Sequence, residues 1–393
     1  MEWKHYKMDD VIDEISMGPF GSDVKKEFYV NKGIPILNGS NLQGFKLQEN
    51  SFGYLTEEKA DSLNKCNAHR GDIIVTHRGT LGQIVYVPSD SKYDRYVISQ
   101  SQFRFRCKPD LVDVQYLVYY FHTREGQYKI LANASQVGVP ALARATSTFR
   151  LIDIKLPSLA DQRRIASILS SLDRKIELNN KINADLEEMA QAIFKNWFVD
   201  FEPFKDGKFV DSELGMIPEG WKVGLLGELC NFKRGKNLLT KNAIDEGVPV
   251  VAGGLEPSCY HNVANTGAPV ITVSGSGANA GFMRMYHVPV WASDCSFIDI
   301  SCENFYFVYC FLKVNSKLLK HAQTGAVQPH VKPSDIHDFE LVIPDKESIY
   351  DFQDKVKPFF DKIASIQKEN SRLSLLRDTL LPRLMSGEIE VPE

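Results

Sequence analysis

An internal duplication constrains this chain more than any other feature of its sequence. Three pairs of segments recur in the same order: GIPILNG (33–39) and GVPVVAG (247–253), Trp3-Lys4 and Trp221-Lys222, and IKLP (154–157) and LVIP (341–344). The offset falls from 218 residues at the tryptophans to 187 at Pro157 and Pro344, so the second copy has shorter loops in the same order of elements. Such a period is too long for a solenoid repeat and predicts two copies of one domain.

The composition of the 393 residues fits two folded domains, because 43% of them are hydrophobic. The formal net charge of −4 argues against a basic protein that coats nucleic acid without selectivity. The seven cysteines form no C-x-x-C pair, which predicts reduced thiols and no metal site. The first residues lack the apolar core of a signal peptide, and no apolar run reaches membrane-spanning length. We therefore expect a cytoplasmic protein with no membrane partner.

Each copy is expected to begin with a mixed α/β unit. Short runs rich in β-branched and aromatic residues, bounded by Gly, Asn or Pro, predict strands in the first copy at 33–39, 72–77, 83–88, 103–107 and 150–157. Helical spacing predicts a helix over 114–131, and the matching segment of the second copy is 304–320.

A long amphipathic helix follows each α/β unit. Ser158 and Asp161 form a helix-opening box, after which apolar residues recur at spacings of three and four. The predicted seam of the first helix consists of Ile165, Leu169, Leu172, Ile176, Asn179, Asn183, Leu186, Ala190, Ile193 and Trp197. That of the second helix includes Val356, Ile363, Ile366, Asn370 and Leu373. A heptad seam interrupted by Asn is typical of a coiled coil, in which the Asn fixes the register.

We expect the two helices to pair with each other in antiparallel orientation, which would relate the α/β units by a pseudo-two-fold axis. The alternative is that each helix packs only on its own α/β unit. Pro358 and Pro382 fall inside the second helical pattern and predict a kink or a late start of that helix.

Motifs for catalysis are largely missing from the sequence. The segment ITVSGSGANAG (271–281) hints at a dinucleotide loop, but its spacing is G-x-G-x-x-x-G and a strand pattern follows it. Neither a G-x-x-x-x-G-K-[ST] phosphate loop nor the Asn-Pro-Pro-aromatic motif of amino-methyltransferases occurs. Asp345 in the segment Pro344-Asp345-Lys346-Glu347 is better explained as a helix cap than as part of a nuclease site. The sequence therefore predicts no catalytic residue and no bound metal.

Polar and basic loops that contain glycine lie at matching places in the two copies. THRGTLG (76–82) and SQVGVPALAR (135–144) match SGSGANAG (274–281) and QTGAVQPHVK (323–332). Glycine lets a backbone approach a partner closely, and the side chains of these loops can donate to phosphates or base edges. The candidate DNA-binding residues are Ser22, Lys25, Lys26, His77, Arg78, Thr80, Gln136, Arg144, Lys233, Arg234, Lys236, Ser276, Asn279, Gln328 and His330. Any single loop is also compatible with a solvated turn, and Arg104 and Arg106 are also compatible with a structural role.

Several longer segments resemble one known family. They are DQRRIASILSSLDRKIELNNKINADLEEMAQAIFKNWFVDFEPF (161–204), SELGMIPEGWKV (212–223), LRDTLLPRLMSGEIEV (376–391), GPFGS (18–22) and GVPAL (138–142). With them the whole chain resembles the specificity subunit of a type I restriction–modification system. The expected fold class is α+β, with two α/β target-recognition domains separated by two long antiparallel coiled-coil helices in a pseudo-two-fold internal repeat. The expected segments are recognition domain 1 (1–157), the first spacer helix (158–202), a linker with recognition domain 2 (203–345) and the second spacer helix (346–393).

By this resemblance the subunit binds double-stranded DNA and reads two half-sites separated by a spacer that it does not read. It docks two modification subunits, which bind S-adenosylmethionine and methylate adenine at N6, and two motor-nuclease subunits add restriction. The chain itself is implied to be non-catalytic and to bind no cofactor. The second copy has PHV (329–331) where the first has PAL (140–142), which implies different half-sites. Two other classes stay open: a stand-alone DNA-modifying enzyme, which the missing motifs disfavour, and a coiled-coil scaffold that binds proteins.

Overall fold

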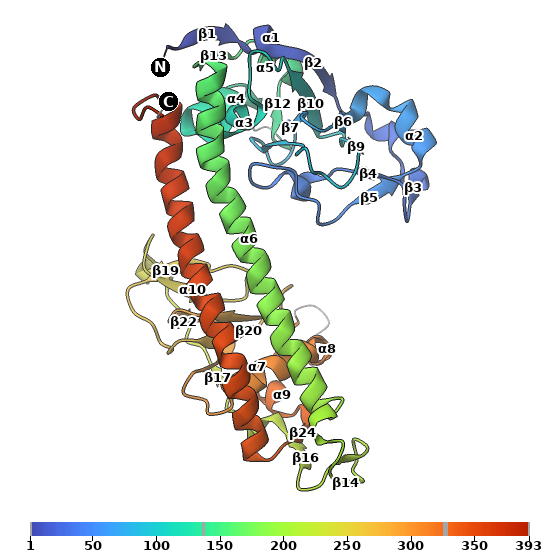
Figure 1. Ribbon diagram of the computed structural model, residues 1–393, viewed down its shortest axis with the longest axis vertical. Coiled ribbons are helices and arrows are strands. Elements are labelled where there is room, and N and C mark those ends of the chain that lie inside the picture. The colour runs from blue at the N-terminus through green and yellow to red at the C-terminus, as the bar shows by residue number, and fades with distance from the viewer. Residues whose placement is uncertain (1, 136–137, 325–328, 392–393) are drawn as a thin grey trace. The chain divides into compact units, whose positions relative to one another are not determined.

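The computed structural model describes residues 2–135, 138–324 and 329–391 and divides into two compact units. Unit 1 comprises Met1–Glu177 and Asn370–Glu393, and unit 2 comprises Leu178–Glu369. The long helices α6 (Leu159–Phe198, green in Figure 1) and α10 (Lys346–Met385, red) each contribute one part to each unit.

Unit 1 has two main sheets, with strand orders β2-β10-β7-β8 and β3-β5-β4-β9-β6, and two short pairs, β1-β13 and β11-β12. Its strands are β1 (Lys4–Lys7), β2 (Ile12–Met17), β3 (Tyr29–Val30), β4 (Ile34–Ile36), β5 (Gly53–Leu55), β6 (Asn67–His69), β7 (Ile73–Thr76), β8 (Ile84–Tyr86), β9 (Arg95–Val97), β10 (Gln102–Cys107), β11 (Ala134–Ser135), β12 (Ala141–Leu142) and β13 (Asp153–Leu156). Its shorter helices are α1 (Met8–Val11), α2 (Glu57–Ser62), α3 (Val114–His122), α4 (Arg124–Leu131) and α5 (Ala145–Arg150). The helix predicted over 114–131 is interrupted at Thr123, whose hydroxyl accepts from the Gly126 amide at 3.1 Å and caps α4.

Unit 2 has sheets of order β17-β23-β20-β21 and β19-β18-β22 and the pairs β16-β24 and β14-β15. Its strands are β14 (Phe209–Val210), β15 (Ile217–Pro218), β16 (Lys222–Leu225), β17 (Lys233–Arg234), β18 (Val248–Val251), β19 (Cys259–His261), β20 (Val270–Ser274), β21 (Met283–Tyr286), β22 (Trp291–Ala292), β23 (Cys295–Asp299) and β24 (Glu340–Ile343). Its shorter helices are α7 (Phe305–Val314), α8 (Ser316–His321) and α9 (Pro333–His337). The Gly-rich segment 271–281 runs from strand β20 to strand β21, so it lacks the following helix of a dinucleotide-binding motif.

The two units repeat one topology, which confirms the internal duplication. The order β2-β10-β7-β8 in unit 1 matches β17-β23-β20-β21 in unit 2, and β1-β13 matches β16-β24. The parallel pair of β4 with β9 matches the parallel pair of β18 with β22. In both units two consecutive helices follow the main sheet, a short helix follows them, and a long helix comes last.

In unit 1, the first part of α6 and the last part of α10 run antiparallel and share one core with the α/β unit. Ile165 and Leu169 of α6 are fully buried there together with Leu381 and Leu384 of α10. The Ser158 hydroxyl accepts from the Asp161 amide at 3.2 Å, so the predicted cap of α6 is present.

In unit 2, the last part of α6 and the first part of α10 are also antiparallel. Phe194 lies 5.2 Å from Phe307 of α7 and 5.7 Å from Phe352 of α10, measured between ring centroids. The helices therefore pack on each other as well as on the α/β unit, so the alternative that each helix packs only on its own α/β unit is wrong. The amide of Asn179 donates to the Glu369 carboxylate at 2.9 Å, which places a polar contact between the two helices in this unit.

The remaining residues of the predicted seam differ in their exposure. Asn179, Val356, Ile363 and Ile366 are buried, whereas Leu172, Ile176, Leu186, Ile193, Asn370 and Leu373 are half-buried. The buried face of α6 in unit 2 consists of Ala190, which the seam predicts, and of Phe194 and Phe198, which lie outside the predicted seam.

The prediction that prolines delay the second helix is wrong. Helix α10 begins at Lys346, capped by Asp345, whose carboxylate accepts from the Ser348 amide at 2.8 Å, and it continues through Pro358 and Pro382. Pro358 removes the hydrogen bond to the carbonyl four residues earlier, and its ring crowds that carbonyl. That carbonyl belongs to Asp354, an exposed residue, so water can satisfy it.

Candidate nucleic-acid interface

Two loops of unit 1 that are far apart in sequence are joined by backbone hydrogen bonds. The Gly79 amide donates to the Pro140 carbonyl at 2.9 Å, and the Leu142 amide donates to the His77 carbonyl at 2.8 Å. Arg78 and Ala141 face each other as an isolated β-bridge between these bonds. The backbone under Arg78 is therefore fixed, while its side chain is exposed to solvent. Gly79 has a φ of +90°, which favours glycine at this crossing.

The side chains around this crossing differ in what they can donate. The His77 Nε2 atom lies 3.2 Å from the Gln100 carbonyl, and burial lowers the pKa of the ring below its ordinary 6.5. His77 is therefore neutral at pH 7, and its Nε2 atom is already in contact with a carbonyl group of the protein. Thr80 and Arg144 are exposed, and Arg144 has a left-handed backbone at the N-cap of α5.

The 18–26 loop of unit 1 lies beside this crossing. The Gly18 amide donates to the Gln102 carbonyl at 2.8 Å, and a Cβ atom at Gly21 would lie 2.4 Å from the Gln100 side-chain oxygen. Because Gln100 also contacts His77, these two loops form one surface. Three of the predicted DNA-binding residues on it, Ser22, Lys25 and Lys26, are exposed.

Unit 2 builds the same crossing from different side chains. The Gly277 amide donates to the Pro329 carbonyl at 3.1 Å, and the Val331 amide donates to the Gly275 carbonyl at 3.1 Å. Ser276 and His330 form the isolated bridge between these bonds. By position in the two crossings, Arg78 of unit 1 therefore corresponds to Ser276 of unit 2, and Ala141 corresponds to His330. Two other predicted residues, Gln136 and Gln328, lie outside the described residues.

Charged groups gather around the crossing of unit 2. Arg234 forms an ion pair with Asp294, and the Ser276 hydroxyl donates to the same carboxylate. A cavity of about 410 Å³ is lined by Arg234, Gly275, His330, Lys332, Pro333 and Ser334. Such a basic hollow suits a phosphate oxygen, which accepts from arginine and lysine.

The other predicted residues of unit 2 have less in common. Lys233 and Lys236 are exposed near Arg234. Asn279 is half-buried, and its amide donates to the Gly253 carbonyl at 3.4 Å, so it is turned toward its own chain.

Lys332 belongs with these residues, although it was not among the predicted ones. It is exposed and stands at the N-cap of α9, as Arg144 stands at the N-cap of α5, just after the second loop of each crossing. The matched loops SQVGVPALAR (135–144) and QTGAVQPHVK (323–332) carry this signal, because they are equally long and end on Arg144 and Lys332.

The arginines of the 103–107 strand are structural. Arg104 is buried and pairs with Glu14 at 2.7 Å and with Asp72 at 3.4 Å, and Arg106 pairs with Asp72 at 2.8 Å. The hydrogen bond from Arg104 lowers the pKa of the Glu14 carboxyl. These guanidinium groups hold β10 against its neighbours, so they are not available to a ligand.

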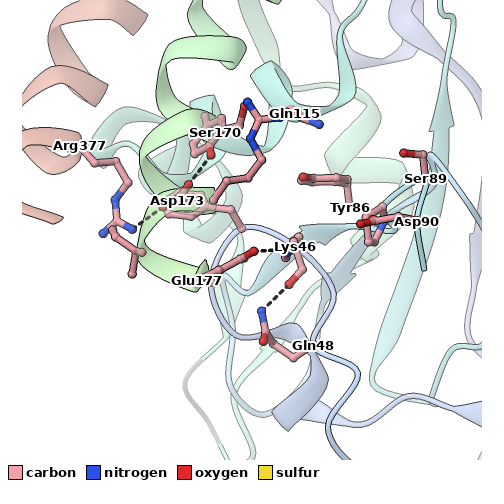
Figure 2. Close-up of a pocket in the computed structure, with 16 residues that line it drawn as sticks. Lys46, Gln48, Tyr86, Ser89, Asp90, Gln115, Ser170, Asp173, Glu177 and Arg377 are labelled. Atoms are coloured by element: carbon pink, nitrogen blue, oxygen red, sulfur yellow. Dashed lines mark hydrogen bonds and ion pairs between the residues drawn. The ribbon is translucent and has the colours of Figure 1, made fainter. Parts of the chain in front are cut away.

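A network of polar side chains seats the α/β unit of unit 1 on its helices (Figure 2). Asp173 of α6 pairs with Arg377 of α10 at 2.8 Å and also accepts from the Tyr119 hydroxyl of α3. Lys46 pairs with Glu177 at 2.5 Å. These groups line a cavity of about 560 Å³. We call Tyr119, Asp173 and Arg377 the junction cluster of unit 1.

The described residues contain no group of three or more His, Cys, Asp or Glu side chains that could hold a metal ion. None of the helices that the structure describes is long and apolar enough to cross a membrane. All seven cysteines are free, and burial raises the pKa of Cys107 to about 12, so this thiol is not reactive at neutral pH.

Comparison with known proteins agrees with this architecture. The family model "Type I restriction modification DNA specificity domain" matches residues 1–188 and 218–374, one match for each copy of the repeat. The chain belongs to this family. It is 29% identical to the MjaIX specificity subunit of Methanocaldococcus jannaschii, over all of this chain and 94% of the relative. It is 25% identical to the HindI specificity subunit of Haemophilus influenzae, over 99% of this chain and all of the relative.

A solved structure shows the same fold. The S subunit of a type I restriction–modification system from M. genitalium superposes with a TM-score of 0.58 at 20% identity, covering 98% of this chain and 96% of that one. The expected fold class of the specificity subunits is thereby confirmed.

Proposed function

We propose that this specificity subunit reads a bipartite DNA target, with each unit contacting one half-site through its loop crossing. The observation that carries the proposal is the repeated backbone crossing with exchanged side chains, Arg78 and Ala141 in unit 1 and Ser276 and His330 in unit 2. The backbone of the crossing is the same in both units, so each unit can approach DNA in the same way, while the different side chains select different bases.

The proposal assigns the chemistry to partner proteins. Two modification subunits bind S-adenosylmethionine and methylate adenine at N6, and two motor-nuclease subunits add cleavage. This chain contributes recognition and no catalytic group. The absence of catalytic motifs from the sequence supports this division, and the basic groups at the crossings support contact with DNA.

The test is a domain exchange in a reconstituted methylation complex. Residues 1–157 are replaced by the same region of a relative with a known target, and methylated sites are mapped across a genome. We expect one half-site to change and the other to stay. A change in both half-sites would contradict independent reading by the two units.

A protein-binding scaffold is the competing function. It predicts that the complex of this chain with both modification subunits has no preference for any DNA sequence, which the same methylation map detects. Methylation by this chain without its partners would instead favour a stand-alone enzyme.

A further inference from the structure

Phe20 is 80% exposed, the highest value among the large hydrophobic side chains described. A single exposed apolar residue is ordinary on a protein surface and means little by itself. Phe20 differs because its backbone is fixed and its surroundings are polar and basic.

The backbone on both sides of Phe20 is held in place. A Cβ atom at Gly18 would lie 2.0 Å from the Ser99 carbonyl oxygen, so the chain is pressed against the sheet there. Pro19 is buried, and the Phe20 amide donates to the Asp23 carboxylate at 3.2 Å. The ring is therefore presented to solvent by a preorganised loop, and binding would not have to order that loop.

The neighbours of the ring favour nucleic acid as its partner. Gly21 lies against Gln100, which contacts His77 of the loop crossing, and the exposed Lys25 and Lys26 follow within a few residues. The core of a protein–protein interface is depleted of lysine. An exposed aromatic ring and exposed lysines on one loop are instead the combination with which proteins stack on bases while holding the backbone.

Unit 2 lacks this ring at the equivalent place. The Gly235 amide donates to the Cys295 carbonyl at 2.8 Å, as the Gly18 amide does to the Gln102 carbonyl, so Gly235 is the counterpart of Gly18. The residue two positions later is Asn237 in unit 2 and Phe20 in unit 1. A contact made to two copies of one partner protein would call for the ring in both units. A ring in one unit alone suits a contact to one half-site.

We propose that Phe20 contacts DNA and that its ring stacks on a base at an opened step within the half-site read by unit 1. This inference rests on the proposed function. Inserted apolar side chains open and kink a base step, and pyrimidine–purine steps open most readily. Phe20 would thereby favour half-sites with such a step without a hydrogen bond to any base.

The experiment measures binding of the complete methylation complex to a DNA duplex that contains the sequence it methylates. We expect Phe20→Ala to weaken binding by about 5- to 140-fold, as for the loss of one stacked base. Phe20→Trp should bind within a few-fold of the wild type, because it keeps a stacking face, and Phe20→Leu should resemble Phe20→Ala. Since Phe20 is uncharged, its loss should leave the salt dependence unchanged, whereas Lys26→Ala should reduce the slope by about one if it contacts phosphate.

Tyr128→Ala is the matched control. Tyr128 of α4 is 75% exposed in the same unit but belongs to none of the predicted DNA loops, so its loss should leave binding unchanged. Equal melting temperatures of all variants would show that the fold is intact.

Three results would overturn the inference. The first is wild-type affinity of Phe20→Ala, and the second is wild-type affinity of Phe20→Leu, which would mean an apolar contact without stacking. The third is a loss of modification-subunit association in Phe20→Ala, which would mean that the ring docks a protein. If the wild-type complex itself fails to prefer its target, the proposed function is wrong, and that result is distinct from all three.

Discussion

The two units share one backbone topology, but the side chains that connect each α/β part to its helices differ. The offset of 187 that relates Pro157 to Pro344 also relates Asp173 to Phe360 and Ala190 to Arg377. Two charged members of the junction cluster of unit 1 therefore correspond to an aromatic ring and a methyl group in unit 2. Tyr119 of α3 and Tyr309 of α7 occupy the same place, each preceded by valine.

Tyr309 of unit 2 donates to a carboxylate at a different position. Its ring lies 5.4 Å from that of Phe360 at 87°, and its hydroxyl donates to Glu187 of α6, which also pairs with Lys313 at 3.1 Å. Burial raises the pKa of the Tyr309 hydroxyl, so it stays a donor that needs an acceptor. In both units the buried tyrosine hydroxyl donates to a carboxylate of α6, but that carboxylate stands at a different position of the helix.

The largest effect is expected from breaking the junction cluster of unit 1. Asp173→Ala leaves the Tyr119 hydroxyl without its acceptor and leaves Arg377 with only its second partner, Asp378, at 2.8 Å. The Arg377 and Asp173 side chains are only 19% and 18% exposed. We expect the free energy of unfolding of unit 1 to fall by about 2–4 kcal/mol. Hydrogen exchange at the amides of β10 reports this unit separately from unit 2.

Asp361→Ala is the control for that variant. Its partner Lys357 lies 2.7 Å away within α10, and both side chains are more than half exposed. The loss should stay below about 0.5 kcal/mol. Equal effects of the two substitutions would remove the distinction between a buried and an exposed pair.

The second prediction transfers the chemistry of unit 2 into unit 1. The double variant Asp173→Phe with Arg377→Ala also removes the guanidinium that has lost Asp173, and it should recover about 1–2 kcal/mol relative to Asp173→Ala. Asp378, which also pairs with Arg377, is 59% exposed and can be solvated. It should stay less stable than the wild type, since Tyr119 still lacks its acceptor. Hydrogen exchange of β10 is again the measurement. A double variant less stable than the single one would mean that the two junctions are not interchangeable.

The third prediction concerns the loop crossings. Among the described residues Arg78 takes part in no ion pair, whereas Arg234 of unit 2 is held by Asp294. Arg78→Ala should therefore weaken DNA binding of the methylation complex by about 1–3 kcal/mol and relax base preference at one half-site, as expected for a bidentate base contact.

A panel of single-base target variants measures this preference. Arg234→Ala is the comparison, and we expect it to weaken all targets together and to reduce the salt slope. Uniform weakening by Arg78→Ala would reassign Arg78 to phosphate, and unchanged binding would remove it from the interface.

The sequence predicted the elements of the fold better than the interactions between them. The duplication, the strands near 72–77, 83–88 and 103–107, and both long helices follow from local spacing, and the structure contains them. The junction cluster was not predicted, because a search for apolar heptads passes over charged residues such as Asp173 and Arg377. Lys332 lies in a predicted loop, 323–332, but was not named as a single candidate residue. The helix caps of α5 and α9 show that it is equivalent to Arg144.

The helix start at Lys346 shows the limit of a local rule. Proline is unfavourable inside a helix because of one lost hydrogen bond and one steric contact. The apolar face of α10, with Phe352 and Val356 fully buried, outweighs that local cost. A local sequence rule cannot predict this packing, because it depends on residues of the partner helix and the sheet.

The smallest effect expected is a response to pH that the two units share. Burial lowers the pKa of His122 in unit 1 and of His287 in unit 2 below the ordinary 6.5, and the Arg377 charge adds to this at His122. The unfolded chain therefore takes up protons near pH 6.5 that the folded chain refuses. Stability is complete above that pH and declines as the pH falls toward the folded pKa, by at most about 1.4 kcal/mol per pH unit for each histidine.

Substitution of each histidine separates the two contributions. In His122→Gln, a side-chain amide can still donate to the Ile84 carbonyl, which the His122 Nε2 atom approaches at 2.9 Å. The free energy of unfolding of unit 1, taken from hydrogen exchange after correction for the intrinsic exchange rate at each pH, should then lose the His122 part of its dependence on pH between 6.5 and 5.5. The part due to His77, whose pKa burial also lowers, should remain, and unit 2 should keep its own response. His287→Gln should do the reverse. If His122→Gln leaves the pH dependence of unit 1 unchanged, His77 or carboxylates set that dependence and His122 does not.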